Sequence, residues 1–178
     1  MLKNLVIVCA LGIMASVATA QIQTVPVVDG ARFVGTWYRI ASNPIIVEPA
    51  CACARQVLTP APGGDVEVYN SCNKKVVSGP LVEIRGVAKS DGGSSSKLKV
   101  YFNGIPWGGQ YWILAVADDY SWAVVSDGKG RSLYIMSKAP TLSDALYAKA
   151  VAAAQAQGVS TKKLERQVQQ GCSYPSAK

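Results

Sequence analysis

The sequence predicts an all-β protein, an eight-stranded antiparallel up-and-down β-barrel with one C-terminal α-helix packed outside. Three observations support this fold class. Short runs of alternating apolar and polar residues extend from Gly35 to Lys138. These runs are separated at nearly regular intervals by Gly, Pro, Asn and Ser. One stretch of helix formers follows them. Such a pattern is typical of antiparallel strands that are joined in sequence order.

The expected strands lie between these turn residues. They cover residues 35–41, 51–59, 65–72, 81–89, 97–102, 111–117, 121–126 and 132–138. Side chains alternate between the two faces of a strand, so Leu98, Val100 and Phe102 should point inward, whereas Lys97 and Lys99 should point outward. Eight strands close into a barrel that is wide enough for one small ligand.

One helix is expected over residues 145–157. N-cap candidates and an early acid occupy residues 140–144, and Gly158 ends the helix. Its apolar face should pack on the outside of the barrel. That face consists of Leu146, Ala150 and Ala153, with Tyr147, Val151 and Ala154 beside them. Residues 164–168 are expected to form a last short strand.

The first 20 residues resemble a cleavable secretory signal. Lys3 precedes an apolar run, and Ala18-Thr19-Ala20 forms an Ala-x-Ala cleavage site. The run is too short for a membrane span. Cys9 lies inside it without the small residues that a lipid-attachment site requires. We therefore expect an exported protein, periplasmic or secreted and not lipid-anchored, with residues 21–178 as its single domain.

Charge and composition narrow the class of function. The formal net charge is +7 and becomes +6 when Lys3 is removed with the signal. The basic residues are scattered, with no run longer than two, which indicates a solvated basic surface and no nucleic-acid partner. The chain contains no histidine, the commonest acid–base residue and a common metal ligand. We expect no catalytic residue, no metal and no cofactor.

Four cysteines follow the signal, namely Cys51, Cys53, Cys72 and Cys172. An even number in an exported chain predicts two disulfides, and three pairings are compatible with four cysteines. A hairpin that turns at Pro62-Gly63 brings Cys53 close to Cys72, which leaves Cys51 to pair with Cys172. Metal binding through Cys51-x-Cys53 is the alternative, but exported thiols usually oxidise.

Three stretches together resemble the lipocalin family in order and spacing. They are Gly35-Thr36-Trp37-Tyr38, Ala117-Asp118-Asp119-Tyr120 and Ile135-Met136-Ser137-Lys138-Ala139-Pro140. Residues 111–115 and 138–144 look most similar to the apolipoprotein D and bacterial lipocalin branch. The resemblance covers residues 29–172 and implies that Gly35, Trp37, Asp119, Tyr120 and Lys138 are structural motif residues.

The resemblance also implies how the closed end is built. In lipocalins a basic residue at the end of the last strand, usually arginine, covers the first-strand tryptophan. Here it is Lys138, which supplies a cation over Trp37 and donates to nearby carbonyls, but lacks the planar guanidinium. In related proteins the counterpart of Cys51 pairs with the tail cysteine that matches Cys172.

Inward-facing residues are the candidate ligand contacts. The alternation places on the interior face Gln56, Val68, Asn70, Ile84, Leu98, Val100, Tyr111, Ile113, Tyr134 and Met136. Burying eight to ten methylene groups contributes roughly 6 to 8 kcal/mol before ordering costs. A micromolar dissociation constant needs about 8 kcal/mol, so hydrophobic burial is nearly sufficient, and the hydroxyls and amides need only orient a polar head.

Two loops expected at the open mouth carry apolar side chains. They contain Ile45-Ile46-Val47 and Ile105-Pro106-Trp107. Three interpretations are open for Ile45, Ile46 and Trp107: a ligand gate, a rim that touches a membrane or a second copy of the chain, and local loop packing. We expect a monomer or a weak homodimer.

The resulting hypothesis is binding, storage or transport of a small hydrophobic or amphiphilic ligand, such as a fatty acid or a lysophospholipid, inside the barrel. One alternative is a protein-binding scaffold that acts through the mouth loops. A second is a lipocalin-type enzyme with a free cysteine nucleophile. Cys51 and Cys53 are expected on the strand face opposite Gln56 and to be oxidised, which disfavours the enzyme.

Overall fold

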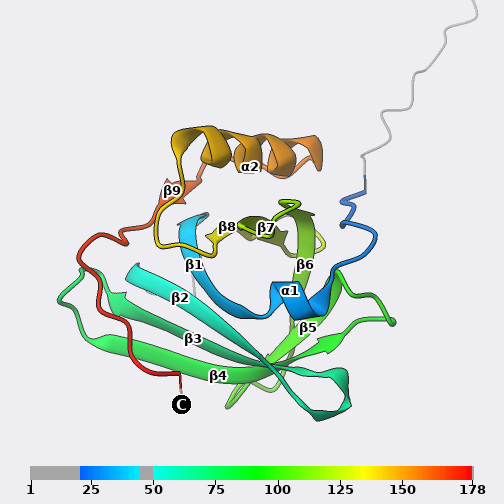
Figure 1. Cartoon of the computed structure of the whole chain (residues 1–178), viewed down its shortest axis with the longest axis horizontal. Coiled ribbons are helices and arrows are strands. Elements are labelled where there is room, and N and C mark those ends of the chain that lie inside the picture. Colours follow the sequence, from blue (N-terminus) through cyan, green and yellow to red (C-terminus); the bar gives the residue numbers. More distant parts are fainter. Residues whose placement is uncertain (1–20, 45–49, 178) are drawn as a thin grey trace, which may run out of the picture.

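The computed structural model describes residues 21–44 and 50–177. Eight antiparallel strands close into an up-and-down barrel (Figure 1). They are β1 (Gly35–Ser42), β2 (Cys51–Pro60), β3 (Val66–Lys74), β4 (Leu81–Ser90), β5 (Lys97–Phe102), β6 (Gly109–Val116), β7 (Trp122–Ser126) and β8 (Leu133–Ser137). Each strand pairs with the next along the chain, and β1 pairs with both β2 and β8, which closes the ring. The predicted fold class is confirmed.

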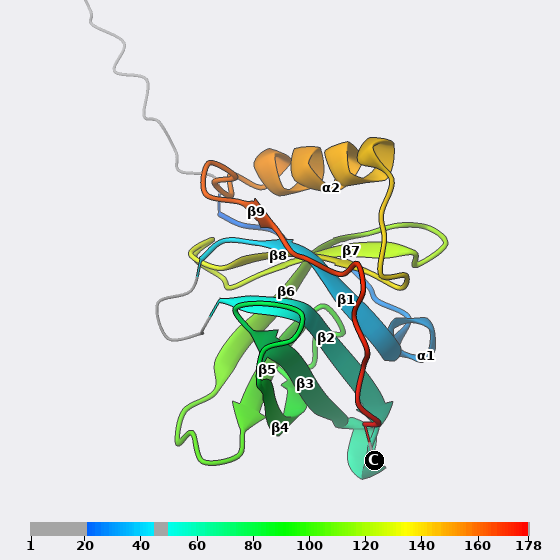
Figure 2. The same cartoon turned by 90° about the vertical axis from the view of Figure 1, so that its left-hand side faces the viewer.

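The observed strand ends differ from the expected ones by at most two residues. A short helix, α1 (Gly30–Phe33), precedes β1 and was not predicted, because four residues are too few to show a helical period. The Asp29 carboxylate caps it by accepting hydrogen bonds from the amides of Ala31 and Arg32. α1 lies at one end of the barrel (Figures 1 and 2), and residues of α1 and of the β2–β3 and β4–β5 connections line the interior at this end, which we call the base.

A ninth strand completes the sheet outside the barrel. β2 pairs with β1 only over Gly35–Tyr38, and farther along β1 the short β9 (Glu165–Arg166) pairs with Ala41 and Ser42. The strand expected over residues 164–168 therefore shrinks to two residues. β9 pairs with the part of the β1 edge that β2 leaves unpaired.

The helix α2 (Asp144–Ala156) packs outside the barrel against β6, β7 and β8 (Figure 2). Tyr147, Ala150, Val151, Ala153 and Ala154 join a second hydrophobic core between the helix and the wall. Leu146 does not belong to that core, contrary to expectation, because packing turns the 147–150–154 stripe toward the sheet. Within the described residues, neither helix is long and apolar enough to cross a membrane.

The disulfide pairing differs from the expected one. Cys51 bonds to Cys72 and Cys53 bonds to Cys172, with Cα–Cα distances of 5.6 and 5.5 Å. The predicted bridges Cys51–Cys172 and Cys53–Cys72 are therefore wrong.

A β-bulge at Cys53 explains the difference. The register of β2 against β3 shifts between Ala52 and Arg55, and Cys53 adopts a left-handed φ of 58°. Its amide donates to the carbonyl of Val168 at 2.8 Å, so Cys53 faces the C-terminal segment. Cys51 lies opposite Lys74, which makes Cys72 its diagonal neighbour on the same face. The predicted pairing came from counting residues equally on both sides of the turn, and such a count does not reveal an inserted bulge residue.

Candidate ligand-binding site

Inward-facing side chains of the barrel line two adjoining cavities. The base cavity, next to α1, has a volume of about 320 Å³. The mouth cavity lies toward the opposite end, where the loops after β5 and β7 border it, and has a volume of about 1020 Å³. Both volumes fall near or within the range of roughly 300 to 1,000 Å³ that is usual for small-molecule sites.

The structure places all of the predicted ligand-contacting residues at these cavities. Val68, Leu98 and Ile113 line the base cavity, Asn70, Ile84, Trp107, Tyr134 and Met136 line the mouth cavity, and Gln56, Val100 and Tyr111 line both. Alternation was sufficient to find the strand residues because it fixes which side chains point inward, whereas Trp107 was predicted from its apolar loop.

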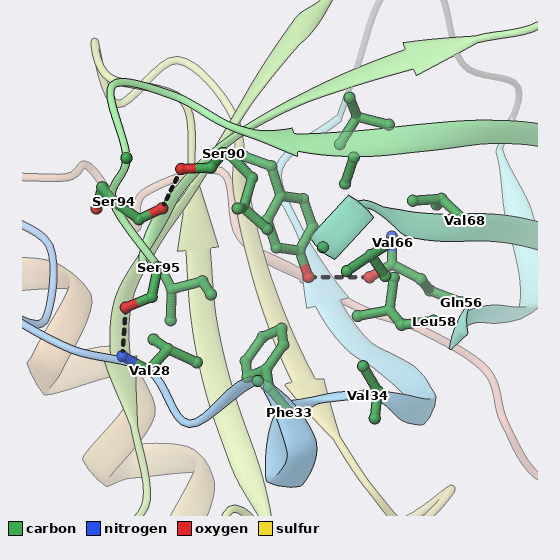
Figure 3. A pocket seen from close by; sticks show the side chains of 18 residues that line it. Val28, Phe33, Val34, Gln56, Leu58, Val66, Val68, Ser90, Ser94 and Ser95 are labelled. Atoms are coloured by element: carbon green, nitrogen blue, oxygen red, sulfur yellow. Dashed lines mark hydrogen bonds between the residues drawn. The ribbon is translucent and has the colours of Figure 1, made fainter. Parts of the chain in front are cut away.

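A chain of polar side chains separates the two cavities. The Tyr111 hydroxyl donates to Gln56 Oε1 at 2.9 Å, and Gln56 Nε2 donates to Asn70 Oδ1 at 3.1 Å. Tyr111 lies on β6 and Gln56 on β2, which are four strands apart in either direction around the ring. We call Tyr111, Gln56 and Asn70 the crossbar, because their hydrogen bonds span the interior of the barrel (Figure 3 marks the bond at Gln56 with a dashed line).

Burial makes the crossbar a neutral element at ordinary pH. Loss of contact with water raises the pKa of the Tyr111 hydroxyl well above its usual value, and the charge of the Tyr134 phenolate would raise it further. Tyr111 therefore keeps its proton and remains a hydrogen-bond donor. Gln56 is only 8% exposed, so its carbonyl oxygen depends on that donor.

The wall of the base cavity is largely apolar. It includes several side chains that were not among the predicted site residues, namely Val28, Phe33, Val34, Leu58, Val66 and Ala88 (Figure 3). Leu58 and Val66 each lie two residues from a predicted inward position, so the same alternation could have found them. Val28, Phe33 and Val34 enter from the segment around α1, which shows no hydrophobic period in the sequence.

The mouth cavity carries charge as well as apolar surface. Its lining includes Arg39, Arg55, Lys99, Lys129 and Arg131 together with Glu83, Asp91 and Asp127. Arg131 Nε forms an ion pair of 2.9 Å with Asp127. Partial burial acts to raise the pKa of Asp127, but the amides of Arg131 and Lys129 and the Arg131 guanidinium outweigh this effect and hold it below its usual value.

Lys138 and Trp37 pack together at the base of the barrel and tie the end of α1 to it. The Lys138 ammonium lies 4.3 Å from the centre of the Trp37 ring, and it donates to the carbonyls of Phe33 and Val34. Trp37 is 0% exposed, and its indole N–H also donates to the Phe33 carbonyl at 2.6 Å. Removal of the ammonium from water lowers the pKa of Lys138. At Gly35, with φ of 98°, a Cβ would lie 3.5 Å from Lys138 Nζ.

The motif residues Asp119 and Tyr120 form a turn beside α1. Tyr120 accepts a hydrogen bond from the Asp29 amide at 2.9 Å, and the Arg32 guanidinium lies 4.2 Å above its ring. Hydrogen bonds from Ser121 lower the pKa of the fully exposed Asp119 carboxylate. Both residues hold the turn and the N-terminal segment together and lie outside the two cavities.

The apolar mouth loops are described only in part. Trp107 is 72% exposed and Ile105 lies beside it at the mouth cavity. Ile45 and Ile46 fall outside the described residues. Around the same end, Val76, Leu81 and Val82 are also exposed.

The four cysteines at positions 51, 53, 72 and 172 are all oxidised in disulfides. None of these four sulfurs is therefore available as a thiolate nucleophile. Within the described residues, no group of three or more His, Cys, Asp and Glu side chains is placed to hold a metal ion.

A family model described as the lipocalin-like domain matches residues 28–169. The chain belongs to the lipocalin family. This lipocalin is similar to temperature-induced lipocalin-1 of Arabidopsis thaliana, with 28% identity over 142 residues, or 76% of each chain.

Solved structures share the fold of this lipocalin at lower identity. Lobster apocrustacyanin A1 is 15% identical, with 85% of this chain and 92% of that chain covered, and insecticyanin from the tobacco hornworm Manduca sexta is 18% identical, with 82% and 83% covered. A biogenic amine-binding protein is 17% identical, with 86% and 90% covered. The TM-score is 0.65 in all three cases.

Proposed function

We propose that this lipocalin binds one amphiphile, such as a fatty acid or a lysophospholipid, in its mouth cavity for storage, scavenging or transport. The observation that carries the proposal is the composition of this cavity, which has about 1020 Å³ of space, apolar walls and charged side chains in its lining. An apolar cavity with a few polar groups is the usual form of a small-molecule site. Lipocalins are generally binding proteins, in keeping with this proposal.

The apolar part of the ligand would lie between the crossbar and the mouth. Ile84, Val100, Phe102 and Met136 supply apolar wall there. Each methylene group that leaves water contributes about 0.8 kcal/mol, so a long alkyl chain provides most of the binding free energy.

The charged lining favours an anionic head group. Arg39 on the inner face of β1 and Lys129 and Arg131 in the β7–β8 loop line the mouth cavity together with one acid, Asp127, which pairs with Arg131. A carboxylate or phosphate would therefore meet a net attraction at the mouth. A cationic amine, the ligand class named for one solved structural relative, would meet a net repulsion.

Binding of two probes of equal chain length tests this proposal. Palmitate should bind in the micromolar range, and hexadecyltrimethylammonium should bind about tenfold more weakly, a difference of about 1.4 kcal/mol. Native mass spectrometry after purification without detergent would identify a copurifying lipid. An empty protein that binds neither probe would contradict the proposal.

A matched pair of variants locates the site. Ile84 on β4 lines the mouth cavity, whereas Val87 on the same strand does not line it. Ile84→Asp should weaken palmitate binding by about tenfold or more, because it places a charge in the apolar wall. Val87→Asp should change the affinity little. Equal losses in both variants would place the ligand elsewhere.

We further propose transient membrane contact through the exposed rim that includes Trp107. Trp107 and Val82 both line the mouth cavity, and Leu81 and Val76 are exposed beside Lys74 and Lys75. Tryptophan and basic residues are typical of surfaces that meet anionic lipids. Vesicles with phosphatidylserine should change Trp107 fluorescence in the wild type and not in Trp107→Ser. No change in the wild type would exclude the contact.

We also propose that the protein is exported after cleavage behind Ala20, as a monomer or weak dimer of residues 21–178 in the apolipoprotein D and bacterial branch. The signal-like N-terminus, the two disulfides and the similarity of residues 111–115 and 138–144 to that branch support the proposal. N-terminal sequencing of the mature protein should begin at Gln21. A mature protein that still begins at Met1 would contradict it.

A further inference from the structure

We propose that the base cavity is a second ligand site with its own entrance, and that it takes a small neutral molecule with an apolar body and one hydrogen-bonding group, such as a medium-chain alcohol. This inference is separate from the proposed amphiphile in the mouth cavity. It rests on three features of the base cavity: a gap in its wall, an uncharged lining and the crossbar that separates it from the mouth.

The gap lies among three glycines from three different elements. Gly30 begins α1, Gly64 lies in the β2–β3 connection and Gly93 lies in the β4–β5 turn. All three are exposed, and all three line the base cavity. A Cβ at any of them would meet no atom within 4 Å. No side chain therefore closes the cavity at these positions, and we call them the base window.

The surroundings of the base window agree with an opening. Val66 and Leu98 point into the barrel but are only half-buried. The edges are held in place, since the Val28 amide donates to the Ser95 hydroxyl at 2.9 Å (Figure 3) and the Asp29 amide donates to the Tyr120 hydroxyl at 2.9 Å. An entrance with fixed edges does not require the barrel to open.

The lining of the base cavity selects against charge. None of its 18 residues is Asp, Glu, Lys or Arg, in contrast to the mouth cavity. A carboxylate or an ammonium would leave water without a partner of opposite charge, which is costly. The volume of about 320 Å³ is at the lower end of the usual range for small ligands. A small neutral molecule fits both limits.

The crossbar offers such a molecule its polar contact. The amide nitrogen of Gln56 carries two hydrogens and donates one of them to Asn70, and the hydroxyl oxygen of Tyr111 can accept a hydrogen bond while it donates to Gln56. A ligand hydroxyl at the top of the base cavity would thus find a donor and an acceptor. The alkyl part would extend toward the base window.

Methyl NMR can report the two cavities separately. Val68 and Ile113 line only the base cavity, whereas Ile84 and Met136 line only the mouth cavity. Titration with 1-octanol should shift the Val68 and Ile113 methyl signals. Octanoate should bind at this site at least about tenfold more weakly than 1-octanol. Shifts of the mouth reporters alone, or equal affinities at the base for both probes, would overturn the proposal.

Obstruction of the base window tests the separate entrance. Gly30→Phe adds a ring at the gap, and the backbone tolerates it because Gly30 does not have a left-handed φ. Ala31→Phe is the control, since it adds the same ring to the next residue of α1, which does not line the cavity. Exchange of 1-octanol at Val68 and Ile113 should slow by about tenfold in Gly30→Phe and stay unchanged in Ala31→Phe. Gly30→Leu provides a smaller obstruction should the first variant not fold. If the Gly30 variant is folded and its exchange rate of 1-octanol is unchanged, then 1-octanol enters through the mouth, and the separate entrance is excluded.

Occupation of both sites distinguishes this inference from the proposed function. With palmitate at saturation, read from Ile84 and Met136, the affinity of 1-octanol at the base should change by about twofold or less. Displacement of octanol by palmitate would show one continuous site and overturn the second site. Failure of palmitate to shift the mouth reporters would contradict the proposed function alone, because octanol binding is read from other methyl groups.

Discussion

Tyr111 on β6 and Gln56 on β2 are joined by a hydrogen bond of 2.9 Å that crosses the interior of the barrel. The two strands lie on opposite sides of the ring, so this bond connects parts of the wall that no backbone ladder connects. It also divides the interior, because both residues line the base cavity and the mouth cavity. The bond therefore contributes to stability and decides the shape of the space available to a ligand.

Removal of the Tyr111 hydroxyl should destabilise the fold. In Tyr111→Phe the buried Gln56 oxygen loses its donor, which should lower the free energy of unfolding by about 1 to 3 kcal/mol in urea denaturation. Tyr101→Phe is the control, since Tyr101 lies on the outer face of β5 and is 39% exposed. A loss in Tyr101→Phe as large as in Tyr111→Phe would contradict the role of the crossbar.

Stability should fall at alkaline pH because of Tyr111. Burial, and to a smaller degree Tyr134, raises its pKa above the ordinary value of 10.0, so the folded state keeps a proton that the unfolded state releases. The contribution of protonated Tyr111 to the free energy of unfolding is complete below pH 10 and is lost as the pH rises toward the pKa of the folded state. The free energy of unfolding then falls by up to about 1.4 kcal/mol per pH unit. Urea denaturation of wild type and Tyr111→Phe between about pH 9 and 11 should show the steeper fall in the wild type. Parallel pH profiles would exclude Tyr111 as the source.

The disulfide pairing can be read from single variants. Cys51→Ser should release the thiol of Cys72, and alkylation followed by mass spectrometry should find the label there. A label on Cys172 would support the pairing predicted from the sequence instead.

The two bridges should differ in their effect on stability. Cys53–Cys172 closes a loop with a sequence separation of 119, and Cys51–Cys72 one of 21. In the chain-entropy model, loss of the longer loop costs roughly 4 to 5 kcal/mol and loss of the shorter one about 3 kcal/mol. Thermal unfolding of Cys172→Ser and Cys72→Ser should therefore show the larger loss in Cys172→Ser. The reverse order would contradict the expectation from loop length.

The contact between α2 and the barrel should tolerate little added volume. Ala150 is 0% exposed at this contact, so Ala150→Leu should destabilise the protein by about 1 to 3 kcal/mol. Ala152→Leu lies on the exposed side of the same helix and should leave the stability within about 0.5 kcal/mol of the wild type. Chemical denaturation of both variants checks this difference. Equal losses of stability in the two variants would mean that α2 packs on the barrel with a different face.

Lys138 should be replaceable by arginine but not by methionine. Lys138→Met removes the donor to the Val34 carbonyl and the cation over Trp37, which should cost about 1 to 3 kcal/mol in urea denaturation. Lys138→Arg keeps the charge and the donors and should lose less. A methionine variant as stable as the wild type would mean that these two contacts of Lys138 do not stabilise the base of the barrel.

The sequence determined the strands, the helix and the inward face. Hydrophobic alternation is local, because each side chain points opposite to the one before it, and this property placed Val68, Ile113 and Met136 on the interior wall without knowledge of the fold. The Gly35–Trp37 motif and its companions then indicated the family. A helix of four residues such as α1 has no period to detect.

How these elements meet depends on packing across the whole barrel. The bulge at Cys53 redirects one side chain and so exchanges both disulfide partners, although the local sequence looks like an unbroken strand. The bond between Tyr111 and Gln56 depends on closure of the ring, which brings together residues 55 positions apart. Contacts across the interior arise from the curvature and stagger of all eight strands together, and that geometry belongs to no single segment of the chain.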